Sequence, residues 1–253
     1  MIYGDSLTKR GMKLYDKGNT DKAIELYQKA WDKYQDPEAL FKLAFHMQIM
    51  EELGKEINKK QKVEYFDIVK PLLLEVANKQ ESNQLYLQNV YEAQCFLGMI
   101  YYHGYGTTKV DIKSTIKWFE KSLFSEDINI LRFANYYLGE CYFLASYKMK
   151  DDKKAFEYFI KSAELGSILG MSKAGAGYLL GLGGVKKDYK KAFEYLNIAV
   201  AKGIAEAQYI ISTMYIDGLG MKKDKKRGIE YLELSAKQGY ENAINLLKEL
   251  NKK

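Results

Sequence analysis

Apolar residues recur along most of the chain at intervals of three, four and seven residues, which is the spacing of one face of an α-helix. Leucine, alanine, lysine and glutamate are plentiful, strand-forming residues are modest in number, and tyrosine occurs 22 times. The pattern therefore predicts an all-α protein whose helices pack through aromatic side chains.

The same pattern returns with a period of about 36 residues. The segment "AGAGYLLGLGGVKKDYKKAFEYLNIAVAKG" aligns with "ISTMYIDGLGMKKDKKRGIEYLELSAKQG", and two earlier segments join the same alignment. The alignment produces a small-residue column (Gly98, Gly139, Gly175, Ser212), a tyrosine column (Tyr101, Tyr142, Tyr178, Tyr215) and an aromatic column (Trp118, Tyr158, Tyr195, Tyr231).

Each repeat is predicted to form two helices joined by a turn that contains glycine. Asp111, Asp188 and Asp224 stand where an N-cap would accept backbone hydrogen bonds, and Gly166, Gly203 and Gly239 stand where a left-handed residue would end the second helix. The small column allows neighbouring helices to approach closely, and the aromatic columns fill the space between them. One such hairpin cannot bury its own apolar face, so the units are expected to stack.

These residues resemble the Sel-1-like repeat family, a longer-looped relative of the tetratricopeptide repeat. The resemblance rests on the order small-residue helix, "GLG", "VKKD", "KA", aromatic residue, alanine and closing glycine, and it extends from Glu92 to Gly239. It is weaker in the unit from Ala134, where "LASYKMK" replaces the glycine turn. At the N-terminus, "RGMKLYDKGNTDKAIELYQKA" resembles a tetratricopeptide motif.

The resemblance implies a right-handed α-solenoid of stacked antiparallel helix pairs, formed as a single solenoid over residues 1–253. Residues 37–80 are interpreted as a divergent repeat, with a helix kinked or interrupted at Pro71. The predicted units are a tetratricopeptide-like hairpin at 5–35, the divergent repeat, Sel-1-like repeats at 84–128, 130–166, 169–203 and 205–239, and a C-terminal capping helix at 240–253.

Composition and charge exclude several classes of protein. The hydrophobic share of 47% in 253 residues suits a substantial core, and the net charge of +6 is too mild to indicate nucleic acid by itself. No apolar run approaches the roughly 20 residues of a membrane-spanning helix. Two cysteines, Cys95 and Cys141, are too few for a disulfide framework and lack zinc spacing. We expect no metal or cofactor, and a monomer or weak self-association.

The opening residues lack the apolar core of a secretory signal, which favours a cytoplasmic location. A periplasmic or secreted location stays open for a chain that has lost a leader.

The stretch "GLGGVKK" invites comparison with a phosphate-binding loop. Its glycines follow a helix rather than a strand, no Ser or Thr follows the lysines, and "GLGMKK" returns one repeat later. The stretch is therefore predicted to be a turn between helices, where glycine allows positive φ.

Lysines recur beside these turns, and stacked repeats would present them along one edge. This basic edge is predicted to include Lys186, Lys187, Lys190, Lys222, Lys223 and Lys226. It is either a solvated edge or a surface that binds an acidic protein, nucleic acid or an anionic lipid; nucleic acid is the less favoured of these partners.

The first helix of each pair lines the concave surface in tetratricopeptide-like stacks. Residues there that avoid the core columns are our candidates for a groove that binds a protein or peptide client. The candidates are Phe41, Phe45 and Gln48; Cys95, Met99 and Tyr102; Tyr136, Glu140 and Phe143; Ser172, Ala176 and Leu179; and Tyr209, Thr213 and Ile216. Some of them are equally suited to the core.

The sequence thus predicts a non-enzymatic scaffold or adaptor that binds an extended peptide or partner helix, with polar groups such as Gln48 and Glu140 setting the register. His46 and His103 are the only histidines, and no nucleophile motif is present. The alternatives are binding through the basic edge and a hydrolase activity of the kind ascribed to some secreted Sel-1-like proteins. A convergent acid–base pair beside a pocket would favour the hydrolase.

Overall fold

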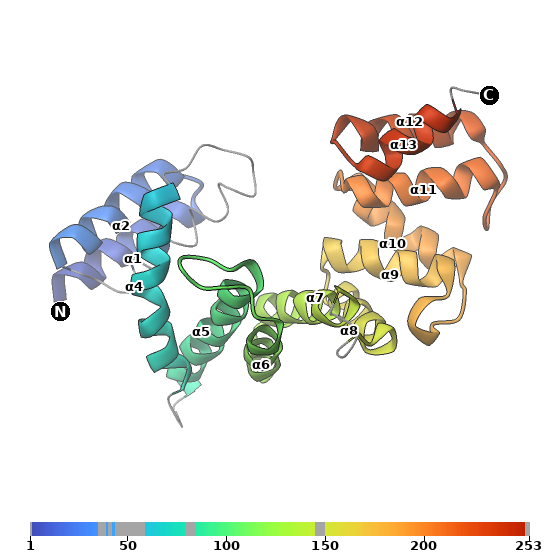
Figure 1. Ribbon diagram of the computed structural model, residues 1–253. Coiled ribbons are helices and arrows are strands. Elements are labelled where there is room, and N and C mark those ends of the chain that lie inside the picture. Colours follow the sequence, from blue (N-terminus) through green and yellow to red (C-terminus); the bar gives the residue numbers. More distant parts are fainter. Residues whose placement is uncertain are drawn as a thin grey trace. The chain divides into compact units, whose positions relative to one another are not determined.

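The computed structural model describes residues 2–34, 39, 42–43, 59–78, 84–144 and 150–250. Within these ranges all regular structure is helical, so the predicted all-α class of stacked helix pairs is confirmed (Figure 1). The chain divides into two compact units, Met1–Trp118 and Phe119–Lys253. Each unit is described by itself.

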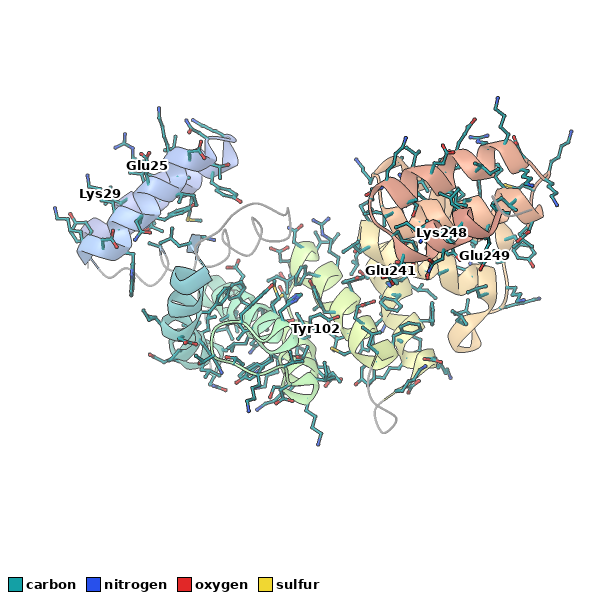
Figure 2. All side chains as sticks on the ribbon, turned by 45° about the horizontal axis from the view of Figure 1, so that its top comes forward. Glu25, Lys29, Tyr102, Glu241, Lys248 and Glu249 are labelled. Carbon is teal, nitrogen blue, oxygen red and sulfur yellow. The ribbon has the colours of Figure 1, made fainter. Side chains whose placement is uncertain are left out.

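The first unit begins with a helical hairpin of α1 (Ile2–Asp16) and α2 (Thr20–Tyr34). The two helices approach closely because position 11 carries glycine: a Cβ there would lie 2.6 Å from the Tyr27 ring. The opposite side of α2 is polar, and Glu25 and Lys29 lie exposed on it (Figure 2).

The next helices of this unit are α4 (Lys59–Ala77) and α5 (Gln84–His103), which pack against each other. A single helix runs through Pro71, so the interruption that the sequence allowed at this proline does not occur. The buried Gln94 side chain donates a hydrogen bond to the Ala77 carbonyl at 3.0 Å and so joins the end of α4 to α5.

The turn that follows α5 is fastened to α4 by polar and aromatic contacts. Asp67 Oδ1 accepts hydrogen bonds from both the backbone N–H and the hydroxyl of Thr107, at 2.8 and 2.9 Å. Lys70 Nζ donates to the Thr108 hydroxyl at 2.9 Å, and the Phe66 ring stacks on Tyr105 at 4.7 Å. The turn is therefore held against the preceding helix pair.

The second unit is a stack of helix pairs that ends in a single helix. After α6, which straddles the division between the units, its elements are α7, α8, α9, η1, α10, α11, α12 and α13. Their bounds are Ile112–Ser122 (α6), Ile128–Leu144 (α7), Asp152–Glu164 (α8), Ile168–Leu180 (α9), Leu182–Gly184 (η1), Tyr189–Ala201 (α10), Ala205–Asp217 (α11), Lys225–Lys237 (α12) and Glu241–Leu250 (α13). The first helices α9 and α11 and the terminal helix α13 form successive layers (Figure 1).

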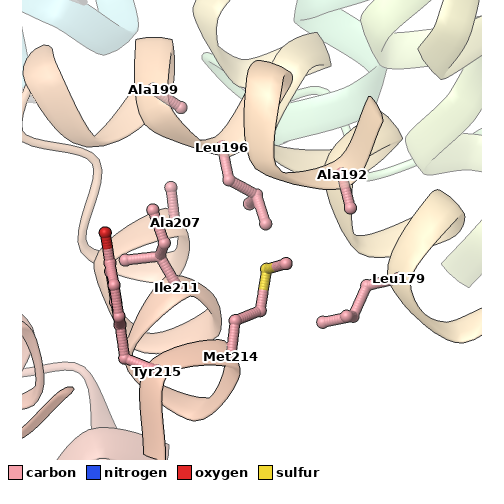
Figure 3. Packing of buried hydrophobic residues seen from close by; sticks show 8 residues of the cluster. All are labelled: Leu179, Ala192, Leu196, Ala199, Ala207, Ile211, Met214 and Tyr215. Atoms are coloured by element: carbon pink, nitrogen blue, oxygen red, sulfur yellow. The ribbon is translucent and has the colours of Figure 1, made fainter. Parts of the chain in front are cut away.

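The core of the second unit lies between the helices of successive pairs. Leu196 of α10 meets Ile211 and Met214 of α11, and all three are fully buried (Figure 3). The small-residue column permits close packing of the two helices within a pair. A Cβ on Gly139 would lie 2.5 Å from the Phe159 ring, and one on Gly175 would lie 2.7 Å from Leu196 Cγ.

The hairpins α5–α6, α7–α8, α9–α10 and α11–α12 are closed by the same backbone hydrogen bond. The N–H of the capping aspartate donates to the carbonyl of the column tyrosine. In the described residues the pairs are Asp111 to Tyr101, Asp151 to Tyr142, Asp188 to Tyr178 and Asp224 to Tyr215, at 2.9 to 3.0 Å. The aspartate side chains also cap the second helices as predicted; Asp188 Oδ1, for example, accepts from the Lys191 N–H at 3.0 Å.

The tyrosine column and the aromatic column stack on each other within each hairpin. The ring pairs, each nearly parallel, are Tyr142 with Tyr158, Tyr178 with Tyr195 and Tyr215 with Tyr231, at centroid distances of 5.9, 6.0 and 5.9 Å. A cation from the first turn of the second helix covers each stack: Lys154, Lys191 and Arg227 lie 4.1, 5.1 and 4.8 Å from the nearer ring centroid. These cations therefore have a structural role in aromatic packing.

The "GLGG" stretch is a turn between helices, as predicted. Gly181 ends α9 in the left-handed conformation, with φ of 71°, and its N–H donates to the Gly177 carbonyl. Gly183 also has positive φ, and a Cβ there would lie 2.3 Å from the Asp152 carbonyl oxygen. Glycine is needed because the turn passes directly against the preceding helix pair.

The terminal helix α13 packs on α12. It buries Ala243 against its neighbour and carries Glu241, Lys248 and Glu249 exposed (Figure 2). Charged residues at the end of a stack keep its last face in water.

We expect Gly139→Val to lower the free energy of unfolding of the protein by about 2 to 3 kcal/mol, because the new side chain would collide with the Phe159 ring. Urea denaturation followed by circular dichroism measures the change. Ala201→Val is the control, since Ala201 is exposed on α10 and should cost less than about 0.5 kcal/mol. Equal effects of the two substitutions would contradict the close packing at Gly139.

Candidate functional site: the first-helix face of the second unit

An ion-pair network joins the first helices of three successive pairs. Lys173 Nζ of α9 lies 3.5 Å from Glu140 Oε1 of α7 and donates a hydrogen bond to Glu206 Oε1 of α11 at 3.1 Å. Ser172 adds a hydroxyl hydrogen bond to Glu206 Oε2 at 3.3 Å. The three charged residues are mostly buried, and they mark the face along which these first helices meet.

The charges of this network depend on each other. Burial disfavours the charged form of Lys173, but the neighbouring carboxylates of Glu206 and Glu140 outweigh it and raise the pKa of the lysine. Burial raises the pKa of Glu140, and the Lys173 charge only partly opposes this. Glu140 Oε1 accepts no hydrogen bond, because 3.5 Å is an ion-pair distance rather than a hydrogen-bond distance. The network holds two carboxylates for one cation.

Exposed leucines lie on the same stripe as the network. Leu169 and Leu180 are 44% and 55% exposed, and helical spacing places them on the Lys173 side of α9. Leu144, four residues after Glu140 on α7, is 64% exposed. We call the surface formed by these leucines and the network the first-helix face. It combines exposed apolar side chains with a fixed polar centre, as many protein interaction surfaces do.

Several predicted groove residues lie on or beside this face. Tyr136 and Phe143 of α7 are half-buried, and their rings pack on the Phe159 ring at centroid distances of 6.1 and 6.3 Å. Tyr209 of α11 is half-buried, and its ring packs on the Tyr240 ring at a centroid distance of 5.4 Å. The Thr213 hydroxyl donates a hydrogen bond to the Ile210 carbonyl. Glu140 belongs to the ion-pair network.

Other predicted groove residues are placed differently or are not described. Met99 of α5 is only 3% exposed and therefore presents almost no surface to a ligand. Tyr102 is half-buried, with its ring edge on His103 at 4.9 Å (Figure 2). Phe41, Phe45 and Gln48 lie outside the described residues.

Of the three groove residues predicted on α9, Ser172 and Leu179 are wrong, whereas Ala176 is partly exposed. Ser172 and Leu179 are buried, while Lys173, Ala176 and Leu180 line the first-helix face. Leu179 instead belongs to the core cluster of the next pair (Figure 3). The alternation of glycine and alanine along α9 gave no apolar signal to fix the register of the helix.

The network has features of a chemical site, but its protonation does not suit catalysis. Lys173 holds its proton because its pKa is raised, so it does not serve as a general base at neutral pH. The neighbouring Ser172 hydroxyl is buried and already donates to Glu206. Among the described residues, no group of three or more His, Cys, Asp or Glu could hold a metal ion.

The predicted basic edge consists of exposed side chains. Lys190, Lys222 and Lys223 line an open hollow of about 930 Å³ between the start of α10 and the turn before α12. Lys186, Lys187 and Lys226 are exposed nearby in the sequence but do not line the hollow. Sequence reasoning grouped the six lysines by repeat position and could not separate the two sets.

Both cysteines are buried thiols that form no disulfide. Burial, with a smaller contribution from the Glu140 charge, raises the pKa of Cys141 to about 12. Within the described residues, no helix is both long and apolar enough to cross a membrane.

Stacked helix pairs with repeated closing bonds and repeated aromatic stacks define an α-helical repeat protein. A model of the Sel1 repeat matches residues 9–33, 92–123, 132–167, 169–204 and 205–240, which together make up more than half of the chain. The chain therefore belongs to the Sel1 repeat family, which confirms the resemblance seen in the sequence. Proteins of this family generally mediate protein–protein interaction and are typically non-enzymatic scaffolds.

Solved structures show the same fold. A Sel1 repeat protein from Oxalobacter formigenes is 25% identical with a TM-score of 0.63, over 97% of this chain and 90% of that one. The protective antigen c5321 of uropathogenic Escherichia coli, which displays an SLR fold, is 21% identical with a TM-score of 0.61. That match covers 99% of this chain but 49% of the antigen, so the chain spans about half of the antigen's length. A search of curated protein sequences gave no significant match.

We expect Lys173→Met to lower the free energy of unfolding by about 2 kcal/mol at neutral pH, because Glu140 and Glu206 would lose their shared cation. Without that cation the pKa of Glu140 in the folded protein rises further. A carboxyl group with a raised folded pKa destabilises the protein only at pH values above its unfolded pKa. The loss should therefore shrink as the pH falls from the raised folded pKa toward about 4.5, the unfolded value.

Urea denaturation at a series of pH values measures this loss. Lys153→Met, at an exposed position on α8, is the control and should change stability by less than about 0.5 kcal/mol. A loss for Lys173→Met that does not depend on pH would show that the network carries no electrostatic linkage.

We expect Cys141 to resist alkylation by iodoacetamide in the folded protein at pH values well below 12, because its thiol stays protonated and buried. Since its folded pKa exceeds its unfolded value near 9.0, the thiol should contribute stability at neutral pH that is lost as the pH rises from 9.0 toward 12. Peptide mass spectrometry of native and urea-unfolded samples measures the labelling. Rapid labelling of native Cys141 would contradict its placement.

Proposed function

We propose that this protein is a non-enzymatic scaffold that binds a protein partner on the first-helix face of its second unit. The Glu140–Lys173–Glu206 network, which fixes a polar centre between exposed leucines, is the observation that carries the proposal. The Lys173 ammonium is held by carboxylates on two neighbouring helices and does not have to be ordered again when a partner binds, which favours affinity.

The chemistry of the face indicates what kind of segment it would accept. Leu144, Leu169 and Leu180 offer apolar contacts to a partner helix or an extended peptide. The network holds one more carboxylate than cations, so a lysine or arginine of the partner placed near Glu206, the more exposed of the two carboxylates, would balance it. The proposed ligand is therefore an apolar segment with a basic residue at its centre.

The half-buried aromatic residues Tyr136, Phe143 and Tyr209 would support this binding. Their rings pack on neighbouring rings and so present part of their surface in fixed positions. Rigid aromatic surface loses little conformational entropy on binding.

The test compares two pairs of substitutions that remove similar exposed apolar surface. Leu169→Glu with Leu180→Glu alters the first-helix face, and Ile198→Glu with Leu234→Glu alters the second helices α10 and α12. The four side chains are 44%, 55%, 44% and 45% exposed in that order, so both pairs should leave the fold intact.

Affinity capture from the native cell, quantified by mass spectrometry, measures the partners bound by each form. We expect the first-helix pair to reduce the captured partner about tenfold or more, because a buried unpaired carboxylate costs over 1.4 kcal/mol at an interface. The second-helix pair should capture as the unaltered protein does. An unchanged partner set with the first-helix pair would show that the proposed face is not the binding surface.

A further inference from the structure

We propose that the hollow between α10 and the turn before α12 is a second binding site, specific for an acidic polypeptide segment. The site lies on the loop edge of the second unit and does not depend on the first-helix face. Its lining comes from the first two turns of α10, from Tyr215 of α11, from residues 220–225 and from Arg227 of α12.

The charge of the hollow gives the sign of the ligand. Five basic side chains line it, against the two acidic side chains of Glu194 and Asp224. Asp224 is already engaged, because its Oδ1 accepts the Arg227 N–H at 3.0 Å as the cap of α12. The basic residues are Lys190, Lys222, Lys223, Lys225 and Arg227. An anionic partner is therefore favoured.

The floor of the hollow is apolar. Phe193, Tyr215 and Met221 line it, and these same side chains belong to or pack against the buried core of the unit. Tyr189, at the rim, is 36% exposed. A ligand that places apolar side chains among its acidic groups would contact both parts of the site, whereas a purely anionic surface would contact only the rim.

The hollow is formed before any ligand arrives, because its turn is fastened at both ends. The Leu219 N–H donates to the Met214 carbonyl at 2.9 Å, and the Asp224 N–H donates to the Tyr215 carbonyl at 2.9 Å. Gly220 lies against α10: a Cβ there would be 2.3 Å from Tyr189 Cβ. The guanidinium of Arg227 is likewise positioned, 4.8 Å from the Tyr215 ring centroid. Preorganised cations lose less entropy when they pair.

A polypeptide fits this site better than a nucleic-acid backbone. Glu194 lines the hollow beside Lys190 and can accept a hydrogen bond from a peptide N–H. The backbone of DNA has no such donor, and that of RNA offers only the ribose 2′-hydroxyl. The ligand that we infer is a short run of Glu or Asp interrupted by leucine or an aromatic residue.

Fluorescence anisotropy tests the proposal with a labelled peptide in which glutamates flank a pair of leucines. The probe is titrated with the full chain and with the variant Lys190→Gln, Lys222→Gln, Lys223→Gln. A matched control removes the same charge elsewhere in the unit, at the exposed Lys202, Lys237 and Lys248, each changed to Gln. Thermal denaturation confirms that each variant is folded.

We expect the hollow variant to bind the peptide about tenfold more weakly, because each of the exposed ion pairs that it loses contributes modestly to the free energy of binding. The control should change affinity less than about twofold. Affinity that falls equally in both variants would reduce the site to general charge attraction and overturn the proposal. Equal or tighter binding of a glutamate-only peptide, or of an oligouridylate, would overturn its polypeptide and apolar specificity.

Discussion

One backbone hydrogen bond recurs in the four hairpins from α5 to α12: the capping aspartate donates its N–H to the carbonyl of the column tyrosine. This bond fixes the end of the first helix against the start of the second, so a single aspartate both caps a helix and closes a turn. The tyrosine ring then stacks on the aromatic residue of the second helix, under a cation from that helix. Four closing bonds of nearly equal length, one in the first unit and three in the second, give these repeats their common geometry.

This geometry separates the surfaces that remain for function. Because each hairpin is closed in the same way, successive first helices of the second unit meet each other, and Lys173 can reach carboxylates on both neighbours. The turns gather on another edge, where Lys190, Lys222 and Lys223 surround one hollow. The two proposed sites are therefore consequences of stacking: one recognises a basic, apolar segment and the other an acidic one. A scaffold with two sites of opposite preference can bring two partners together without chemistry of its own.

The repeat columns were predictable because the same packing problem recurs in every unit. Gly139 and Gly175 admit a ring and a leucine at the helix contact, and the tyrosines and aspartates occupy equivalent places in each hairpin. Alignment of the chain with itself finds such residues. The helix through Pro71 was not settled in advance, since tertiary contacts along α4 outweigh one lost hydrogen bond.

The candidate site was less predictable, for a geometric reason. The partners of Lys173 are 33 residues away in each direction, whereas the repeats are about 36 residues long, so the network crosses the columns diagonally. The columns of the repeat alignment therefore could not reveal this ion-pair network. In α9, glycine and alanine leave the helical register undefined, and so Leu179 and Leu180 could not be assigned to core and surface from the sequence. The hollow forms where Gly220 lies against Tyr189, and the sequence does not show this tertiary contact.

The central claim is that a partner protein binds on the first-helix face, and photo-crosslinking in the native cell tests it most directly. A photoreactive amino acid is placed either at Thr213 of α11, on that face, or at the exposed Glu233 of α12, on a second helix. The account predicts crosslinked adducts from position 213 and none from position 233. Adducts from position 233 with none from position 213 would contradict it.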